Sequence, residues 1–134
     1  MKLWIDDLRP APEGYVWCKS VNRAKNVLER IADCYRVVFY NGSTFTSVHS
    51  EMELEKLRQF DPDLKIISHT DPIEIIDIDH DAGEYASDGG DYIKLLDWLE
   101  ETSRNYPIHI HSQNVVGRMN MEAICRRNGW TILK

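Results

Sequence analysis

Three apolar runs in this chain each end in a cluster of acidic or imidazole side chains. Residues 3–5 lead into Asp6-Asp7, residues 73–78 lead into Asp79-His80-Asp81, and a third run ends in the polar segment 109–114. In a parallel α/β sheet the C-terminal ends of the strands form one edge, and ligands bind in the crevice there. We therefore expect the three runs to be neighbouring strands whose polar ends meet at one site.

Strand-like and helix-like patterns alternate along the chain, which predicts an α/β fold with a mainly parallel sheet. We expect strands at residues 2–5, 15–18, 73–79, 108–111 and 130–133. Helices are expected after the N-cap Ser20, over a segment that contains 92–99, and over 115–127, where Asn114 caps the helix and Gly129 ends it. The polar segment 83–90 is expected to be a loop, with Asp88 or Asp91 near the N-terminus of the following helix.

Residues 34–72 are expected to form an elaboration between the first helix and the central strand. Residues 35–40 and 44–48 are rich in β-forming side chains and flank Asn41-Gly42, a hairpin turn signal. A helix is expected at 51–60, a strand at 64–68, and a turn at 70–72. A chain of 134 residues is most simply one domain, so we expect a single domain over 1–134 that includes this elaboration.

The charge balance limits the classes of partner. A formal net charge of −6, from 16 basic and 22 acidic residues, disfavours long nucleic acid, because such binding depends on Lys and Arg neutralising phosphates. A small nucleotide or an RNA end is not excluded if a metal ion supplies positive charge locally. No apolar run approaches the ~20 residues of a membrane span, and we expect no leader peptide. The cysteines Cys18, Cys34 and Cys125 share no metal-ligand spacing, so we expect reduced thiols in a cytoplasmic protein.

Asp6, Asp7 and Asp79 are the expected metal ligands. Mg²⁺ and Mn²⁺ prefer one or two carboxylates together with water and phosphate oxygens, so acids at adjacent strand ends suit either ion. The plainer alternative is that these acids only solvate turns. The D-x-D-x-D pattern at 77–81 resembles a calcium loop, but Ala82 stands where that loop needs glycine and a strand, not a helix, precedes it. We therefore reject an EF-hand.

The histidines and the polar groups near them provide the expected acid–base and phosphate-binding groups. Strand alternation places His109 and His111 on one face, although His109 fits a hydrogen-bonded core residue equally well. Imidazoles suit proton transfer near neutral pH, and the N-terminus of the helix behind Asn114 offers free N–H groups to an anion. The expected catalytic residues are His80, His111 and Asp81, and the expected phosphate-binding residues are Arg9, Ser112 and Asn114. Arg9 alone fits a surface salt bridge with Asp7.

The core is expected to include Trp4, Trp17, Trp98 and Trp130.

These motifs together resemble a known family. Residues 4–10 read Trp-Ile-Asp-Asp-Leu-Arg-Pro, residues 79–81 read Asp-His-Asp, and residues 110–117 read Ile-His-Ser-Gln-Asn-Val-Val-Gly, followed by Met119 and Met121. In this order they resemble the cyclic-phosphate-processing receiver-like domain, a divergent relative of two-component receivers, over residues 1–32 and 73–133. The resemblance implies a receiver-like (flavodoxin-like) sheet with an acidic pocket at its C-terminal edge, and activity on cyclic phosphates of nucleotides or RNA ends.

The resemblance also implies roles for single residues. Asp6 and Asp7 match the receiver acid pair, and Asp79 or Asp81 matches the phospho-acceptor or metal-ligand aspartate. Ser112 matches the hydroxyl that contacts phosphate. The features that set this family apart from signalling receivers are matched by His80 and His111.

The expected function is that of a metal-dependent phosphoesterase that opens the cyclic phosphate of a small nucleotide or an RNA end, with Mg²⁺ or Mn²⁺ as cofactor. Two alternatives stay open: a non-catalytic binder of a cyclic nucleotide, and a phospho-accepting signalling receiver. Signalling receivers add a helix after a lysine at the end of the last strand, whereas Lys134 is the last residue here, so we rank that alternative lower. Capture without turnover and catalysis need the same groups, so the sequence does not separate them. The oligomeric state is left open.

Overall fold

The computed structural model describes residues 1–30, 35–48, 51–69 and 73–134. The chain divides into two compact units, one formed by Met1–Asn26 with Ile73–Lys134 and the other by Val27–Pro72. The elaboration expected at 34–72 falls in the second unit, and the expectation of one domain over 1–134 stays a prediction. Ile31, Cys34 and the expected turn at 70–72 lie outside the described residues.

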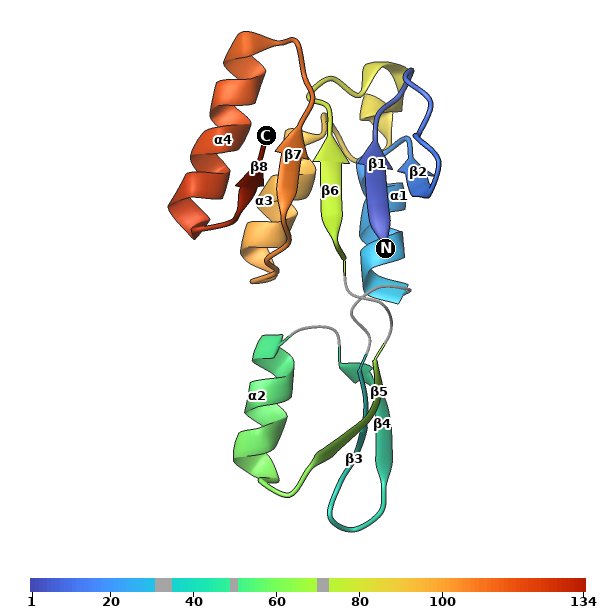
Figure 1. Ribbon diagram of the computed structural model, residues 1–134, viewed down its shortest axis with the longest axis vertical. Helices are drawn as coiled ribbons and strands as arrows, with labels where there is room; N and C mark the ends of the chain where they lie inside the picture. Colours follow the sequence, from blue (N-terminus) through green and yellow to red (C-terminus); the bar gives the residue numbers. More distant parts are fainter. Residues whose placement is uncertain (31–34, 49–50, 70–72) are drawn as a thin grey trace. The chain divides into compact units, whose positions relative to one another are not determined.

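The first unit is built on a five-stranded parallel sheet with the order β2-β1-β6-β7-β8 (Figure 1). The strands are β1 (Lys2–Ile5), β2 (Tyr15–Cys18), β6 (Ile75–Ile78), β7 (Ile108–Ile110) and β8 (Ile132–Leu133). Numbered within this sheet alone, the order is 2-1-3-4-5, which is that of flavodoxin-like folds. The expected receiver-like α/β sheet is confirmed.

One face of this sheet is apolar and carries the core. Its fully buried side chains alternate along the strands, as the twofold period of a strand requires, and comprise Leu3, Ile5, Ile76, Ile78 and Ile108, with Ile110 almost as buried. Helices α1 (Val21–Arg30) and α3 (Ile93–Glu101) lie behind the sheet in Figure 1, and α4 (Val115–Asn128) packs on α3 and β7. The buried positions Leu95, Leu96 and Leu99 confirm the expected apolar face of α3.

The other face of the sheet is polar and aromatic. The register aligns Trp4 with Trp17 on one side and with Asp77 on the other, and Asp77 with His109. Only residues 6–14 join the parallel strands β1 and β2, whereas such a crossover ordinarily takes a dozen or more residues and a helix. Trp4 and Trp17 on this face, and Trp98 on α3, are partly exposed, which corrects their expected place in the core, whereas Trp130 is buried.

Two details of the helix ends differ from expectation. The segment expected to be a loop contains a 3₁₀ helix, η1 (Gly83–Ser87). Asp88 accepts hydrogen bonds from Ser20 Oγ at 2.7 Å and from Asn22 Nδ2 at 3.0 Å, so it stabilises the start of α1, not that of α3. The caps of α4 follow the sequence: Asn114 Oδ1 accepts from Gly117 N, and Gly129 adopts a left-handed conformation (φ 68°).

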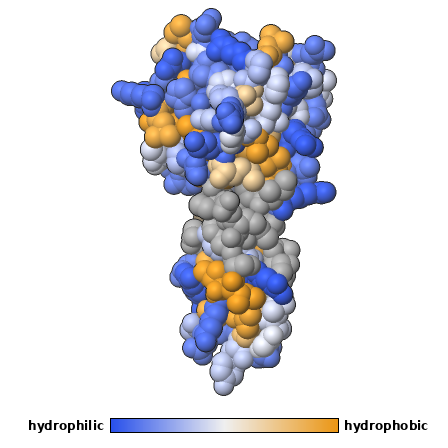
Figure 2. Space-filling view, turned by 45° about the vertical axis from the view of Figure 1, so that its right-hand side comes forward, coloured by the Kyte–Doolittle hydropathy of each residue, from blue (hydrophilic) through white to orange (hydrophobic). Residues whose placement is uncertain are grey.

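The second unit contains an antiparallel sheet with the order β4-β3-β5 and one helix. Its elements are β3 (Tyr35–Val38), β4 (Thr44–Val48), α2 (Glu51–Phe60) and β5 (Lys65–His69). The expected hairpin is confirmed, since Gly42 N donates to Phe39 O across its turn. A small core is formed by Tyr35, Val37, Val48, Leu54 and Leu64. Figure 2 shows further apolar side chains gathered on the surface of this unit.

No helix within the described ranges is both long and apolar enough to cross a bilayer.

Candidate functional site

Three of the predicted site residues meet at the C-terminal edge of the parallel sheet. Asp6, Asp79 and His111 directly follow β1, β6 and β7, whose last residues are aligned in register. One ligand atom from each side chain lies within 4.8 Å of the other two, so the group could hold a metal ion. Carboxylate oxygen and imidazole nitrogen are donors that first-row divalent ions accept.

His111 is held between two carboxylates. Its Nδ1 lies 2.6 Å from Asp77 Oδ1, and its Nε2 lies 2.8 Å from Asp6 Oδ2. A carboxylate accepts hydrogen bonds, so the two acids favour the protonated ring, in which both nitrogens can donate. Burial lowers the pKa of His111, but the bonds to Asp77 and Asp6 outweigh it and raise the pKa above its ordinary value. The Trp4 ring stacks on the imidazole of His111 with 4.1 Å between ring centroids.

The Asp6 carboxylate is fixed by its own turn. Its Oδ1 accepts from the backbone N–H groups of Leu8 and Arg9, each at 2.9 Å. Burial raises the pKa of Asp6, yet these bonds and the one from His111 outweigh it, so the pKa lies below its ordinary value. Trp4 Nε1 donates to Arg9 O at 2.8 Å, and the Arg9 guanidinium reaches His111 O at 3.4 Å. The turn therefore presents both an ionised carboxylate and a cation.

Asp7 adds a further negative charge. Burial raises its pKa, and the charges of Asp6, Asp79 and Asp81 raise it further. A Cβ built on Gly83 would collide with the Asp7 carboxylate, so η1 approaches this side chain as closely as only glycine permits. Carboxylates this crowded favour either a bound cation or a shared proton.

His80 follows β6 and lies next to the start of α4. Its Nδ1 is 2.8 Å from Asp81 Oδ1 and 3.4 Å from Asn114 Nδ2. Its ring also faces Gly117, where any Cβ would come closer than 3.0 Å. Asp79 Oδ1 accepts from the His80 backbone N–H at 2.7 Å, which links this histidine to the acid cluster. The Asp81 side chain itself is largely exposed.

Ser112 and Asn114 have local hydrogen-bond partners at the start of α4. The buried Ser112 Oγ accepts from Asn114 N at 3.1 Å, and Asn114 Oδ1 accepts from Gly117 N at 2.9 Å. These bonds shape the turn that follows β7. A contact of Ser112, Asn114 or Arg9 with phosphate stays a prediction.

Sequence reasoning missed the roles of Asp77 and Trp4. Asp77 is buried and accepts from His109 Nδ1 at 2.8 Å as well as from His111, so it anchors both histidines. The sequence carried a signal for the role of Asp77, because Asp77 and Asp79 are two residues apart and the twofold period of a strand places them on the same face. Only the strand order, however, reveals that this face adjoins that of His109 and His111.

Comparison with known proteins assigns the family. A family model described as the cyclic-phosphate processing receiver domain matches residues 1–127. The match includes residues 34–72, which the motif resemblance alone did not cover. No curated protein and no solved structure matches the chain. With nearly the whole sequence matched, and with the sheet order found here, the chain belongs to the cyclic-phosphate processing receiver domain family.

Proposed function

We propose that this domain is a metal-dependent phosphoesterase that opens the cyclic phosphate of a small nucleotide or an RNA end. The observation that carries the proposal is the meeting of Asp6, Asp79 and His111 within 4.8 Å, in a chain of a family linked to cyclic-phosphate processing. The crowding of acids supports it: burial raises the pKa of Asp7, the charges of Asp6, Asp79 and Asp81 raise it further, and a divalent cation would relieve that concentration of negative charge.

In this proposal Asp6 and Asp79 hold the cation, with Asp7 next to them. A bound Mg²⁺ or Mn²⁺ supplies charge neutralisation for the phosphate oxygens and makes a water molecule more acidic. Arg9, whose guanidinium borders His111, contributes a further positive charge to the same edge of the sheet. Ser112 and Asn114 orient the phosphate at the start of α4.

Ring opening needs a base and an acid. A water oxygen forms a bond to phosphorus, one ring P–O ester bond breaks, and the product is a phosphomonoester with a free hydroxyl. His80 is suited to take the proton of the water, because Asp81 accepts from its Nδ1 and directs the basic lone pair to Nε2. His111 is suited to give a proton to the departing oxygen, since its hydrogen bonds to Asp77 and Asp6 favour its protonated form.

The direct test offers 2′,3′-cyclic nucleotides with Mg²⁺ or Mn²⁺ and follows ring opening by phosphorus NMR. Wild type is compared with Asp79→Asn, His111→Ala and the control Asp97→Asn, which neutralises a partly exposed acid on α3. We expect turnover by wild type and the control, and a loss of about 100-fold or more in the other two, the scale of general acid–base catalysis. Equal turnover in all four proteins, or none in wild type, would contradict the proposal.

The same samples separate the alternatives. A cyclic nucleotide that binds wild type tightly and is recovered intact would indicate capture without catalysis. A long-lived phosphoryl adduct on an aspartate after incubation with acetyl phosphate, cleaved by hydroxylamine, would indicate a phospho-accepting receiver instead.

A further inference from the structure

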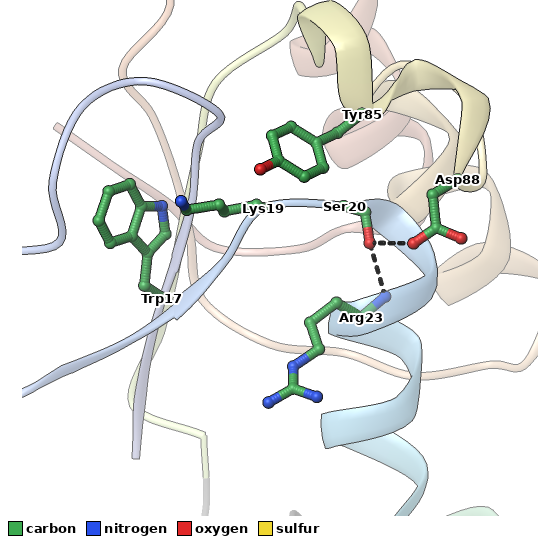
Figure 3. A pocket seen from close by; sticks show the side chains of 6 residues that line it. All are labelled: Trp17, Lys19, Ser20, Arg23, Tyr85 and Asp88. Carbon is green, nitrogen blue, oxygen red and sulfur yellow. Dashed lines mark hydrogen bonds between the residues drawn. The ribbon is translucent and has the colours of Figure 1, made fainter.

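A second pocket lies beside the acid cluster, at the end of β2. Its cavity has a volume of about 400 Å³, within the range of small-molecule sites. It is lined by Trp17, Lys19, Ser20, Arg23, Tyr85 and Asp88, which come from β2, the start of α1 and the segment around η1 (Figure 3). None of these residues has a role in the proposed chemistry.

Two of the three charged side chains that line this pocket, Lys19 and Arg23, are cations, although the whole chain carries −6. Asp88 is already engaged by Ser20 and Asn22. Within the described part of the chain, by contrast, neither Lys19 nor Arg23 pairs with a carboxylate. Both cations are exposed and available to an anionic ligand. The backbone N–H groups at the start of α1 are not available to a ligand, because they already donate to Ser20 Oγ and Asp88 O.

Two aromatic rings border the same cavity. The Lys19 ammonium lies 4.6 Å from the centre of the Trp17 ring and 5.9 Å from that of Tyr85. Figure 3 shows this ammonium extending towards Trp17, with the Tyr85 ring on another side of the hollow. Aromatic faces next to cations are the combination that binds a nucleobase together with its phosphate.

One direct hydrogen bond and one buried tyrosine connect the pocket to the acid cluster. Trp17 Nε1 donates to the backbone oxygen of Asp6 at 2.7 Å. Tyr92, whose pKa is raised by burial and by the charges of Asp7, Asp6 and Asp79, donates to Lys19 O at 2.7 Å. Because β2 and β1 are neighbours, the pocket and the cluster share one edge of the sheet.

We propose that this pocket binds a nucleotide, with the base against Trp17 and Tyr85 and a phosphate held by Lys19 and Arg23. Its assignment as part of the substrate site rests on the proposed function, but nucleotide binding does not. With a cyclic phosphate at the acid cluster, the favoured substrate is then a nucleotide that carries a second phosphate, such as a 5′-phosphorylated 2′,3′-cyclic nucleotide.

Binding is tested first without metal, so that the acid cluster does not contribute. Adenosine 5′-monophosphate, adenosine and ribose 5-phosphate are titrated in EDTA by calorimetry. We expect the monophosphate to bind about ten-fold more tightly than either fragment, since base stacking and phosphate contacts each add to affinity. The variants Lys19→Met/Arg23→Gln and Tyr85→Leu should each weaken it about ten-fold or more.

The matched control is Arg58→Gln/Lys65→Met, which removes two exposed positive charges from the second unit. Its net charge therefore equals that of Lys19→Met/Arg23→Gln. It should bind the monophosphate like wild type. No binding by wild type, unchanged binding by Lys19→Met/Arg23→Gln, or ribose 5-phosphate binding as tightly as the nucleotide would overturn the proposal.

The substrate assignment has its own readout. Wild type should have a lower KM for a 5′-phosphorylated 2′,3′-cyclic nucleotide than for its unphosphorylated counterpart, and Lys19→Met/Arg23→Gln should abolish the difference. Equal KM values in wild type would overturn the substrate assignment. If no cyclic phosphate is opened, the proposed function fails. The titrations in EDTA still test whether the pocket binds a nucleotide.

Discussion

The carboxylate of Asp77 and the imidazole of His111 are joined by a 2.6 Å hydrogen bond between Oδ1 and Nδ1. The two residues come from adjacent strands, β6 and β7, and both are largely buried. Asp6 is hydrogen-bonded to the other ring nitrogen, so His111 links the carboxylate of Asp77 to that of Asp6. Asp77 therefore influences the acid cluster although it is not one of the predicted metal ligands.

Asp77→Asn should lower the pKa of His111 towards its ordinary value of 6.5. The amide carries no charge, so the substitution removes an attraction that favours the imidazolium. The measurement is an NMR pH titration of the His111 ring in metal-free protein. Asp97→Asn removes a more distant and more exposed acid and should leave that titration unchanged. A His111 pKa equal to that of wild type in the Asp77 variant would contradict the prediction.

The unfolding free energy should depend on pH through the same histidine. The raised pKa of His111 contributes stability that is fully present below pH 6.5 and is lost as pH rises through the folded-state pKa. The lowered pKa of Asp6 contributes stability above pH 3.8 that is lost as pH falls through its folded-state pKa. Urea unfolding of wild type and His111→Gln in EDTA should thus give a larger difference at pH 6 than at pH 9. Equal differences would refute this account.

Gly117→Ala should destabilise the protein, although alanine favours helices. A Cβ there would come closer than 3.0 Å to the His80 ring, and overpacking of this kind costs about 1–3 kcal/mol. The gain in helix propensity is at most about 1 kcal/mol, so the clash should prevail. Thermal and urea unfolding measure the effect. Asn120→Ala, on an exposed position of the same helix, serves as the control and should be neutral or stabilising.

A second background isolates the cause. In a His80→Ala protein the ring is gone, so Gly117→Ala should change sign and become neutral or stabilising. If the alanine destabilises both backgrounds equally, its effect does not come from His80.

Cys18 and Cys125 should resist thiol reagents in the native protein. Both are fully buried, and burial raises the pKa of each thiol to about 11. At pH 8 on the order of one part in a thousand is thiolate, the reactive form. In a Cys34→Ser variant, a chromogenic disulfide should label neither cysteine natively and both in urea. Rapid labelling of the folded variant would show that one of these thiols is accessible.

Much of the fold follows from local patterns. The bounds expected for β1, β2, β4 and α2 agree with the structure, because β-forming residue types, apolar periodicity and turn signals are local properties of the sequence. The capping of α1 by Ser20 was visible because a serine hydroxyl at this position accepts from an N–H group of the first turn. The 3₁₀ helix at Gly83–Ser87 was not, since its five residues carry no apolar period and none of them is buried.

The candidate site was only partly visible in the sequence. Polar residues at strand ends placed Asp6, Asp79 and His111 together, because parallel strands share an edge whatever their order. The contacts of Asp77 and Trp4 depend on which strands are neighbours, and that is a tertiary property. The second pocket needed coordinates too, since Trp17 and Tyr85 are far apart in sequence.

The strands β1 and β6 pair directly, although most of the intervening chain forms a separate unit with its own core. The entropy of closing a loop grows only with the logarithm of its length, by about 0.6 kcal/mol for each doubling. The entropic cost of bringing Asp6 next to Asp79 therefore depends only weakly on the length of the segment between them. The fold can accept a longer, shorter or wholly different insert at this position, which makes it a place where new recognition surfaces can evolve while the carboxylates keep their geometry.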